Sequence, residues 1–360
     1  IEWLAGNRIR GTSAEKPVLG LPSGSVGGWV EVGRTTLGSK TSPMTVTSLP
    51  DKRYYMVLSS ALADGTNRAA TTRRLGYGSV DSGSNYSSRR SDNGSSGNTN
   101  INRQHSDNVN LSSDKTPQFS VDYVSNLSST EKMGITEMVL QNTAGSGTAP
   151  DRAESVWKWT NTSNPLDTYE ITREPSESGD WETGSEVVVL GWDPADTHTT
   201  NFWEELASVT TSGAGTSVSS GTFTAKKYLW VQVYAPSGAS QVVDNFWWRF
   251  NGDSGSNYAR RYSSQGGADG TALNDSRVQV SRSGVQGDFT NAFIVNNSAN
   301  EKLMMYHTVP ITALGAGTAP NRQEGVGKWT NTASQITSIV VSANADSFPA
   351  GWIIKVWGSD

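Results

Sequence analysis

Short apolar stretches, separated by polar clusters, recur along the whole chain. In the first half they lie at 54–58, 119–124, 133–140, 155–160 and 186–192, and in the second half at 228–234, 245–250, 292–296, 302–309, 336–341 and 352–357. Clusters of Gly, Ser, Asn and Asp lie between them, as in antiparallel strands joined by turns; the spacing predicts about eight strands in each half. No stretch has a convincing helical period, and residues 204–206 are expected to form at most a turn.

The two halves of the sequence repeat one another. Asp81–Gly94 and Asp253–Gly266 agree at nine of 14 positions, and residues 145–162 and 315–332 agree at 13 of 18. Other matches keep the same order, and their offset falls from 174 to 167 residues, as a few loop deletions would produce. Because solenoid repeats run to only ~20–50 residues, a repeat of this length is a whole domain.

These matches divide the chain into four segments. They are an N-terminal arm (1–28), a first repeat (29–193), a linker (194–202) and a second repeat (203–360). A chain of 360 residues also exceeds the usual size of a single core. We therefore expect an all-β protein with two tandem homologous antiparallel β-sandwiches, jelly-roll-like in architecture, preceded by an extended arm.

Composition narrows the classes of function. Charged residues make up 18% of the chain and the net charge is −5, which gives no basic surface for a nucleic acid. There is no cysteine, which excludes disulfides and thiolate metal sites. No apolar run approaches the ~20 residues of a membrane-spanning helix, so we expect no membrane span. The first residue is Ile rather than Met, which indicates a processed chain or a fragment.

The longest shared motif is T-A-P-[D/N]-R-x-E-x-V-x-K-W-T-N-T. In an extended strand its charged residues share one face and its tryptophans the other, so Trp159 and Trp329 are core candidates. The charged face is either a ligand-binding or interface row, or a set of cross-strand ion pairs on a solvated strand. Its members are Arg152, Glu154 and Lys158 in the first repeat and Arg322, Glu324 and Lys328 in the second.

The repeated stretch DSGSNY has two interpretations. Asp, Ser and Asn oxygens could bind a cation, but calcium requires six to eight oxygens and each copy has one Asp. The alternative is a structural corner in which Gly83 and Gly255 take positive φ while Asp and Asn bond their own backbone. We favour the corner.

Residues 245–250, NFWWRF, distinguish the second repeat from the first, which has ATTRRLGY at the corresponding place. Alternation places Phe246 and Trp248 on one face and Trp247 on the other. An exposed Trp247 or Trp248 could stack on a sugar ring. The alternative is that both tryptophans fill an interface.

Catalytic chemistry finds little support in the sequence. The three histidines, His105, His198 and His307, do not recur at equivalent positions, and none is paired at metal-ligand spacing. Glu154 and Glu324 recur, but no second carboxylate beside them suggests a glycosidase. We therefore expect no enzyme activity, no catalytic residue, no metal and no cofactor.

Several stretches resemble tandem β-sandwich virion structural proteins of marine and environmental viruses. They are LGWDPADTHTTNFWEELASV, GSNYARRYSSQGGADGT, the repeated EK[L/M] and G-x-GTAP-x-R-x-E-x-V-x-KWTNT, and the terminal IIKVWGSD. The opening LAGNRIRGTSAEKP looks like the arm found ahead of such repeats. The resemblance covers most of the chain and brings no catalytic residues with it.

This resemblance implies a self-assembling protein on the virion exterior, as a capsid subunit or as a decoration, spike or fibre protein. It implies a virion or extracellular location and a homo-oligomer, a trimer or larger, formed through sandwich edges and through an arm that crosses to a neighbouring chain. The alternative function is a carbohydrate-binding surface adhesin in which Trp247 or Trp248 stacks on host glycans.

Overall fold

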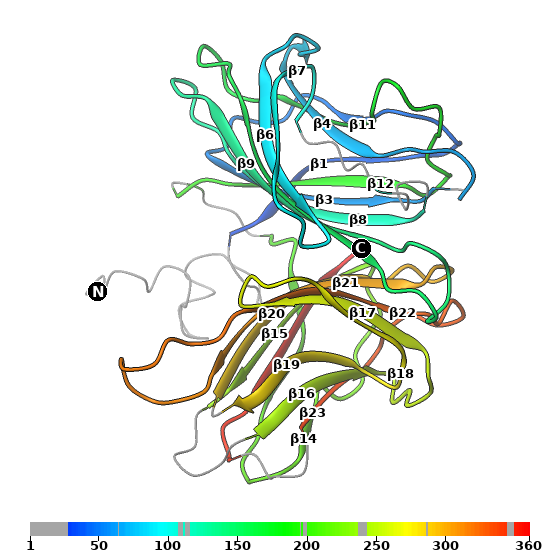
Figure 1. Ribbon diagram of the computed structural model, residues 1–360. Helices are drawn as coiled ribbons and strands as arrows, with labels where there is room; N and C mark the ends of the chain where they lie inside the picture. Colours follow the sequence, from blue (N-terminus) through cyan, green and yellow to red (C-terminus); the bar gives the residue numbers. More distant parts are fainter. Residues whose placement is uncertain are drawn as a thin grey trace. The chain divides into compact units, whose positions relative to one another are not determined.

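The computed structural model describes residues 28–63, 65–106, 111, 116–194, 196, 200–236, 243–285, 287–343 and 349–360, without the side chains of 243, 244 and 282–285. The predicted arm, apart from its last residue, and His198 lie outside the described residues. Within the described ranges the chain forms 24 strands and no helix, so no helix there is able to cross a membrane (Figure 1).

The first repeat forms an eight-stranded and a four-stranded sheet. Their strand orders are β1-β12-β3-β8-β9-β10-β6-β7 and β2-β11-β4-β5, and the paired strands run antiparallel. The strands are β1 (Val30–Thr36), β2 (Met44–Val46), β3 (Tyr54–Ala61), β4 (Thr71–Tyr77), β5 (Ser79–Val80), β6 (Tyr86–Asp92), β7 (Asn98–Arg103), β8 (Gln118–Ser125), β9 (Lys132–Leu140), β10 (Asp151–Trp159), β11 (Thr168–Arg173) and β12 (Glu186–Trp192).

The second repeat has the same strand order in its eight-stranded sheet, β13-β24-β15-β20-β21-β22-β17-β18. Its four-stranded sheet, β14-β23-β16-β19, corresponds in the first three strands only, because the edge strand β19 follows β18 in the chain whereas β5 directly follows β4. The strands are β13 (Glu204–Thr210), β14 (Ser217–Ser219), β15 (Tyr228–Ala235), β16 (Val243–Phe250), β17 (Tyr258–Ser264), β18 (Gly270–Asp275), β19 (Val278–Val285), β20 (Gly287–Val295), β21 (Lys302–Ile311), β22 (Gln323–Trp329), β23 (Ile339–Ala343) and β24 (Ile353–Ser359).

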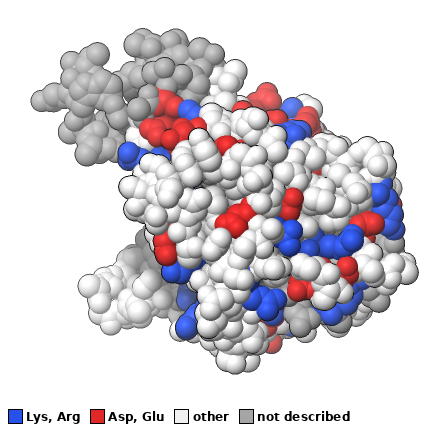
Figure 2. All heavy atoms as spheres, turned by 90° about the horizontal axis from the view of Figure 1, so that it is seen from above, with Lys and Arg blue, Asp and Glu red and all other residues white. Residues whose placement is uncertain are grey.

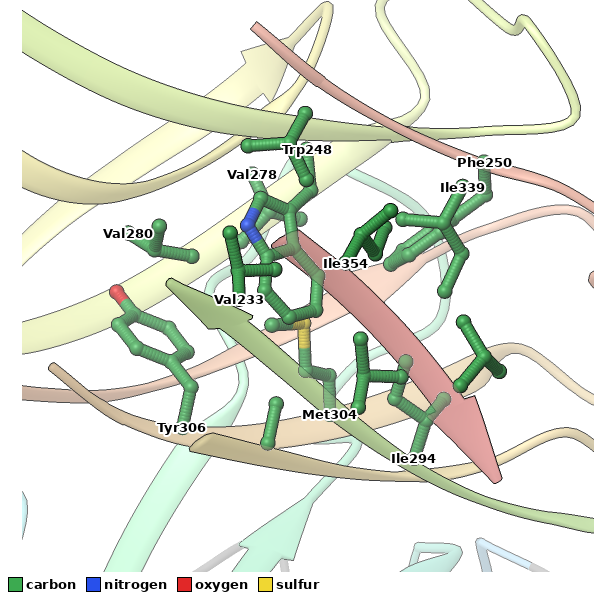
Figure 3. Close-up of a cluster of buried hydrophobic side chains, with 14 of the residues drawn as sticks. Val233, Trp248, Phe250, Val278, Val280, Ile294, Met304, Tyr306, Ile339 and Ile354 are labelled. Carbon is green, nitrogen blue, oxygen red and sulfur yellow. The ribbon is translucent and has the colours of Figure 1, made fainter. Parts of the chain in front are cut away.

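The apolar faces of the two sheets meet in each repeat. In the second repeat, Trp248 of the four-stranded sheet lies among Ile294 and Met304 of the eight-stranded sheet (Figure 3). In the first repeat, Trp159 of β10 and Tyr169 of β11 form the corresponding core. The prediction of an all-β chain with tandem antiparallel β-sandwiches is therefore confirmed.

Two details of the predicted strands are wrong. The structure has twelve strands in each repeat rather than about eight, because polar segments such as β6 and β7 also pair into the sheets. Residues 204–206, expected to form at most a turn, belong to strand β13. Both errors have one cause, since backbone pairing recruits segments that lack an apolar pattern of their own.

The chain divides into two compact units whose bounds differ from those of the repeats. Unit 1 comprises Ile1–Arg90, Gly97–Glu137 and Glu154–Glu205, and unit 2 comprises Ser91–Ser96, Met138–Ala153 and Leu206–Asp360. Two segments of the first repeat, 91–96 and 138–153, are thus part of unit 2.

The DSGSNY stretches form structural corners before β6 and β17. The amide N–H of Gly83 donates to Asp81 at 2.8 Å, and the side-chain amide of Asn85 donates to the same carboxylate at 2.9 Å. The expectation of a positive φ at Gly83 and Gly255 is wrong, because neither residue is among those with positive φ. Space disfavours a larger residue instead, since a Cβ at Gly83 would lie 2.9 Å from Asn85 Nδ2 and would displace the amide that bonds Asp81.

The repeated EK and KWTNT motifs meet at the same end of each sandwich. Lys132 Nζ donates to the carbonyl of Asn161 at 3.0 Å, and Lys302 Nζ donates to that of Asn331 at 2.8 Å. Both lysines are buried, and each ammonium lies 5.9 Å from the ring centroid of the motif's tryptophan. Burial lowers the pKa of Lys302 to about 8. These motifs therefore recur because they complete the packing of each copy.

Candidate functional site

A groove with a volume of about 830 Å³ lies on the outward face of the eight-stranded sheet of the first repeat. The residues that line it all belong to unit 1. We call it the unit 1 groove; its larger apolar side chains are Trp29, Tyr54, Ile101, Tyr123, Met133, Ile135, Val156 and Trp192.

Strand alternation produces this apolar surface. In β9, Lys132 and Gly134 face the interior, whereas Met133 and Ile135 point outward and are 61% and 53% exposed. Val156 of the neighbouring strand β10 is 52% exposed. These three aliphatic side chains lie on one solvent-facing surface together with the other apolar residues of the groove, and a contiguous exposed apolar patch rimmed by polar residues marks an interaction site.

Aromatic rings close one end of the groove. Tyr54 of β3 is paired with Trp192 of β12, and their rings stack with centroids 5.4 Å apart. Trp29 meets Trp192 at 6.3 Å in a tilted arrangement. Burial, with the charge of Glu137 as a second cause, raises the pKa of Tyr123, so its hydroxyl keeps its proton at neutral pH.

Charged residues flank the apolar surface. Lys158 Nζ lies 2.8 Å from Glu131 Oε2, and both side chains are largely exposed. Arg89 of β6 is also exposed at the edge of the groove. Lys158, Arg89 and Glu131 therefore provide charges of both signs beside the groove. The face of the whole molecule that Figure 2 draws likewise carries basic and acidic residues interspersed among uncharged ones.

The matching face of the second repeat is buried. Leu303, Met305 and Val326 occupy the positions of Met133, Ile135 and Val156, and each is at most 3% exposed. The same sheet face is therefore open in one copy and covered in the other.

In unit 2 this face contacts segment 138–153, which comprises the end of β9, the turn at 141–150 and the start of β10. Lys328 Nζ donates to the carbonyls of Gln141 at 3.1 Å and Thr143 at 2.5 Å. The N–H of Gly145 donates to Glu301 at 2.5 Å. Burial lowers the pKa of Lys328, although Glu301 opposes this shift.

The predicted charged residues divide between the two units. In unit 2, Arg152 lies 2.7 Å from Asp269 and 3.4 Å from Glu324, which also pairs with Arg322 at 2.9 Å. In unit 1, Lys158 pairs with Glu131, and Glu154 is half-buried. The expectation of a solvated strand is wrong for the second repeat, because every residue of β22 is buried. Arg152 is buried as well.

Trp247 and Trp248 do not form an exposed platform, so that expectation is wrong. Trp248 is fully buried in the core between the sheets (Figure 3). Trp247 lies on the opposite face, as alternation predicted, but it is only 8% exposed and the Arg277 guanidinium lies 4.0 Å from its ring centroid.

The described part of the chain has no cluster of metal-ligating side chains. No group of three His, Asp or Glu residues there could hold a metal ion. His105 is buried 3.8 Å from Glu174, and His307 is exposed on β21. The carboxylates of the DSGSNY corners accept several hydrogen bonds and are engaged in the fold.

The groove was missed at the level of sequence, although a signal was present. The stretch MGITEMVL has apolar residues at positions of both parities, which indicates a strand with two apolar faces. The aromatic end could not be foreseen, because Trp29, Tyr54 and Trp192 lie on three segments far apart in sequence.

Comparisons with known proteins add no family. Neither models of protein families nor curated proteins match this chain. Among solved structures, domains LG4-5 of the mouse laminin alpha1 chain align over 93% of this chain and 92% of that chain, at 8% identity and a TM-score of 0.20. A TM-score this low supports no argument about function.

Proposed function

We propose that this chain is a non-catalytic structural protein that assembles with further copies of itself through the unit 1 groove. The observation that carries the proposal is the contrast between Val326, 1% exposed, and Val156, 52% exposed, at equivalent positions. Because this face binds polypeptide in one copy of the duplicated fold, the equivalent face of the other copy is suited to bind polypeptide as well.

Burial of the groove supplies the driving force. Removal of apolar surface from water contributes roughly 25 cal/mol per Å². Met133, Ile135 and Val156 would be desolvated together, with Lys158 and Glu131 at the rim to orient the partner. This combination of an apolar centre and a charged rim is typical of protein interfaces.

The proposed setting is the exterior of a virion, or another extracellular assembly. The resemblance to virion structural proteins supports it, as do two β-sandwiches within one chain whose eight-stranded sheets share one strand order. The proposed roles there are those of a capsid subunit or of a decoration, spike or fibre protein.

Sedimentation velocity over a range of protein concentrations tests this function. The wild-type mass is expected to rise with concentration, whereas V156D is expected to remain a monomer because assembly would bury its carboxylate. V309D is the matched control, since Val309 is 44% exposed on β21 of unit 2. A wild-type monomer at every concentration, or normal assembly of V156D, contradicts the proposal.

Carbohydrate binding is the second candidate function. Its candidate site is the aromatic end of the groove rather than Trp247 and Trp248, which are buried. The stacked pair of Tyr54 and Trp192 offers a ring face of the kind on which sugars stack. A glycan array with the wild type and W192A tests it. Binding that W192A abolishes supports this candidate, and binding that is absent or unchanged contradicts it.

A further inference from the structure

In unit 2, the outward face of the eight-stranded sheet of the second repeat binds another segment of the chain. Arg261 donates to the carbonyl of Pro150 at 3.0 Å and lies 3.1 Å from Asp151. Asn274 N–H donates to the carbonyl of Ser146 at 2.9 Å. Together with the bonds of Lys328 and Glu301 described above, these contacts hold segment 141–153 against β17, β18, β22 and the residue before β21.

The turn that would act as the partner is repeated in the second copy. Residues 315–320, GAGTAP, match GSGTAP at 145–150, and Gly145 and Gly315 share a φ of 88°. Ala149 in the seated turn is 5% exposed, whereas its equivalent Ala319 is exposed. The turn between β21 and β22 (residues 312–322) thus shares the positive-φ glycine of the seated turn, but its GAGTAP stretch is exposed to solvent.

The surface that would accept the turn is repeated in unit 1. Glu131, Lys158 and Arg89 occupy the positions of Glu301, Lys328 and Arg261. Asn102, with φ 51°, corresponds to Asn274, with φ 48°. The contacts of unit 2 therefore have counterparts along the unit 1 groove.

Three contacts have no counterpart. Asn321 replaces Asp151, so Arg89 would meet an uncharged amide where Arg261 lies 3.1 Å from a carboxylate. Gly97 stands at the position of Asp269, so an incoming Arg322 would find only Glu154 there. Ala316 replaces Ser146, whose hydroxyl bonds Asn274 at 2.8 Å. The contact between copies is expected to be weaker than the contact within unit 2, and hence reversible.

We propose that the β21–β22 turn of one copy binds the unit 1 groove of a second copy, in the way that segment 141–153 binds in unit 2. This inference rests on the proposed function and names the surface that occupies the groove. The turn and the groove are different surfaces, so each contact between two copies leaves one turn and one groove unoccupied. Such a heterologous contact produces rings or open chains rather than closed twofold dimers.

Two single variants and their mixture test the proposal by sedimentation. A319E blocks the turn and V156D blocks the groove, and both positions are exposed, so both variants are expected to fold. Each variant alone is expected to self-associate about 30-fold more weakly or worse, as for an interface hot spot. An equimolar mixture is expected to form dimers and nothing larger, because only one pair of intact surfaces remains.

The control for the turn is A333E, the same change in another exposed turn of unit 2, which is expected to assemble as the wild type does. If V156D is a monomer while A319E assembles normally, another occupant fills the groove; the inference is then wrong and the proposed function stands. A mixture that stays monomeric also overturns the inference. A wild type that never assembles overturns both.

Discussion

The indole Nε1 of Trp159 donates a hydrogen bond to Oδ2 of Asp81 at 2.7 Å, and Trp329 donates to Asp253 at the same distance. Each bond ties the buried tryptophan of the KWTNT motif to the corner formed by DSGSNY. The two stretches that are most similar between the repeats are therefore bonded to each other within each repeat.

Loss of this bond is expected to destabilise the fold. D81A leaves the indole N–H of Trp159 without its acceptor and removes the bonds from Gly83 and Asn85. We expect the free energy of unfolding, measured by urea denaturation, to fall by about 1–3 kcal/mol. S82A, at an exposed position of the same corner, is the control and should change stability by less than about 0.5 kcal/mol. Equal effects of the two variants would contradict the role of the bond.

Calcium is expected to leave the melting temperature unchanged. Both oxygens of Asp81 and of Asp253 already accept hydrogen bonds from the protein. Differential scanning calorimetry with added calcium and with a chelator checks this. A rise on addition that the chelator reverses would restore the cation interpretation.

A buried ion pair distinguishes the core of the first repeat. Arg73 Nε lies 3.2 Å from Asp122 Oδ1, both side chains are fully buried, and Tyr169 donates to Asp122 at 2.9 Å. Trp248 and Ala292 occupy the equivalent places in the second repeat. R73M or D122L alone should cost about 3–5 kcal/mol by leaving one charge unpaired. The double variant should cost clearly less than the sum in urea denaturation; additive effects would contradict the pairing.

In the first repeat, Gly134 leaves the space that the large side chain of Trp157 fills. A Cβ on Gly134 would lie 2.1 Å from the ring of Trp157, and the second repeat reverses the sizes with Met304 and Gly327. G134M should overlap the ring, and W157G should leave a cavity that costs roughly 3–5 kcal/mol. The double variant should be more stable than either single variant by thermal denaturation. A double variant less stable than both would show that the two sites are not coupled.

Asp288 is expected to make stability depend on pH. Burial raises the pKa of its carboxyl to about 6, although Thr290 and Thr308 donate hydrogen bonds to it. Between the ordinary value near 4 and this value the folded state binds the extra proton, so its stability falls as pH rises and levels off above pH 6. The shift of about two units corresponds to roughly 3 kcal/mol.

The variant D288N removes this dependence. It is expected to be more stable than the wild type at pH 8 and about equal to it near pH 4, measured by urea denaturation at both values. Q118N, a change at the equivalent buried position of the first repeat, should leave the difference between the two pH values as in the wild type. A pH dependence that persists in D288N would contradict the assignment.

The sequence by itself determined the β-class, the duplication and the inward residues of the strongest strands. Alternation alone predicted that Trp159 and Trp329 lie in the core, and both are 1% exposed. These features depend on neighbours within one strand, or on a comparison of two copies, so they are readable without a fold. Polar strands such as β6 and β7 were missed because their partners, rather than their own residues, make them strands.

Only the tertiary structure decided which outward faces are surfaces. Val156 and Val326 lie in nearly the same local sequence, yet one is 52% and the other 1% exposed. In unit 2 the face of β22 that carries Val326 also carries Lys328, which bonds Gln141 and Thr143 of a segment remote in the chain, residues 138–153. Strand alternation fixes which way a side chain points, whereas its burial depends on what the rest of the chain places over it.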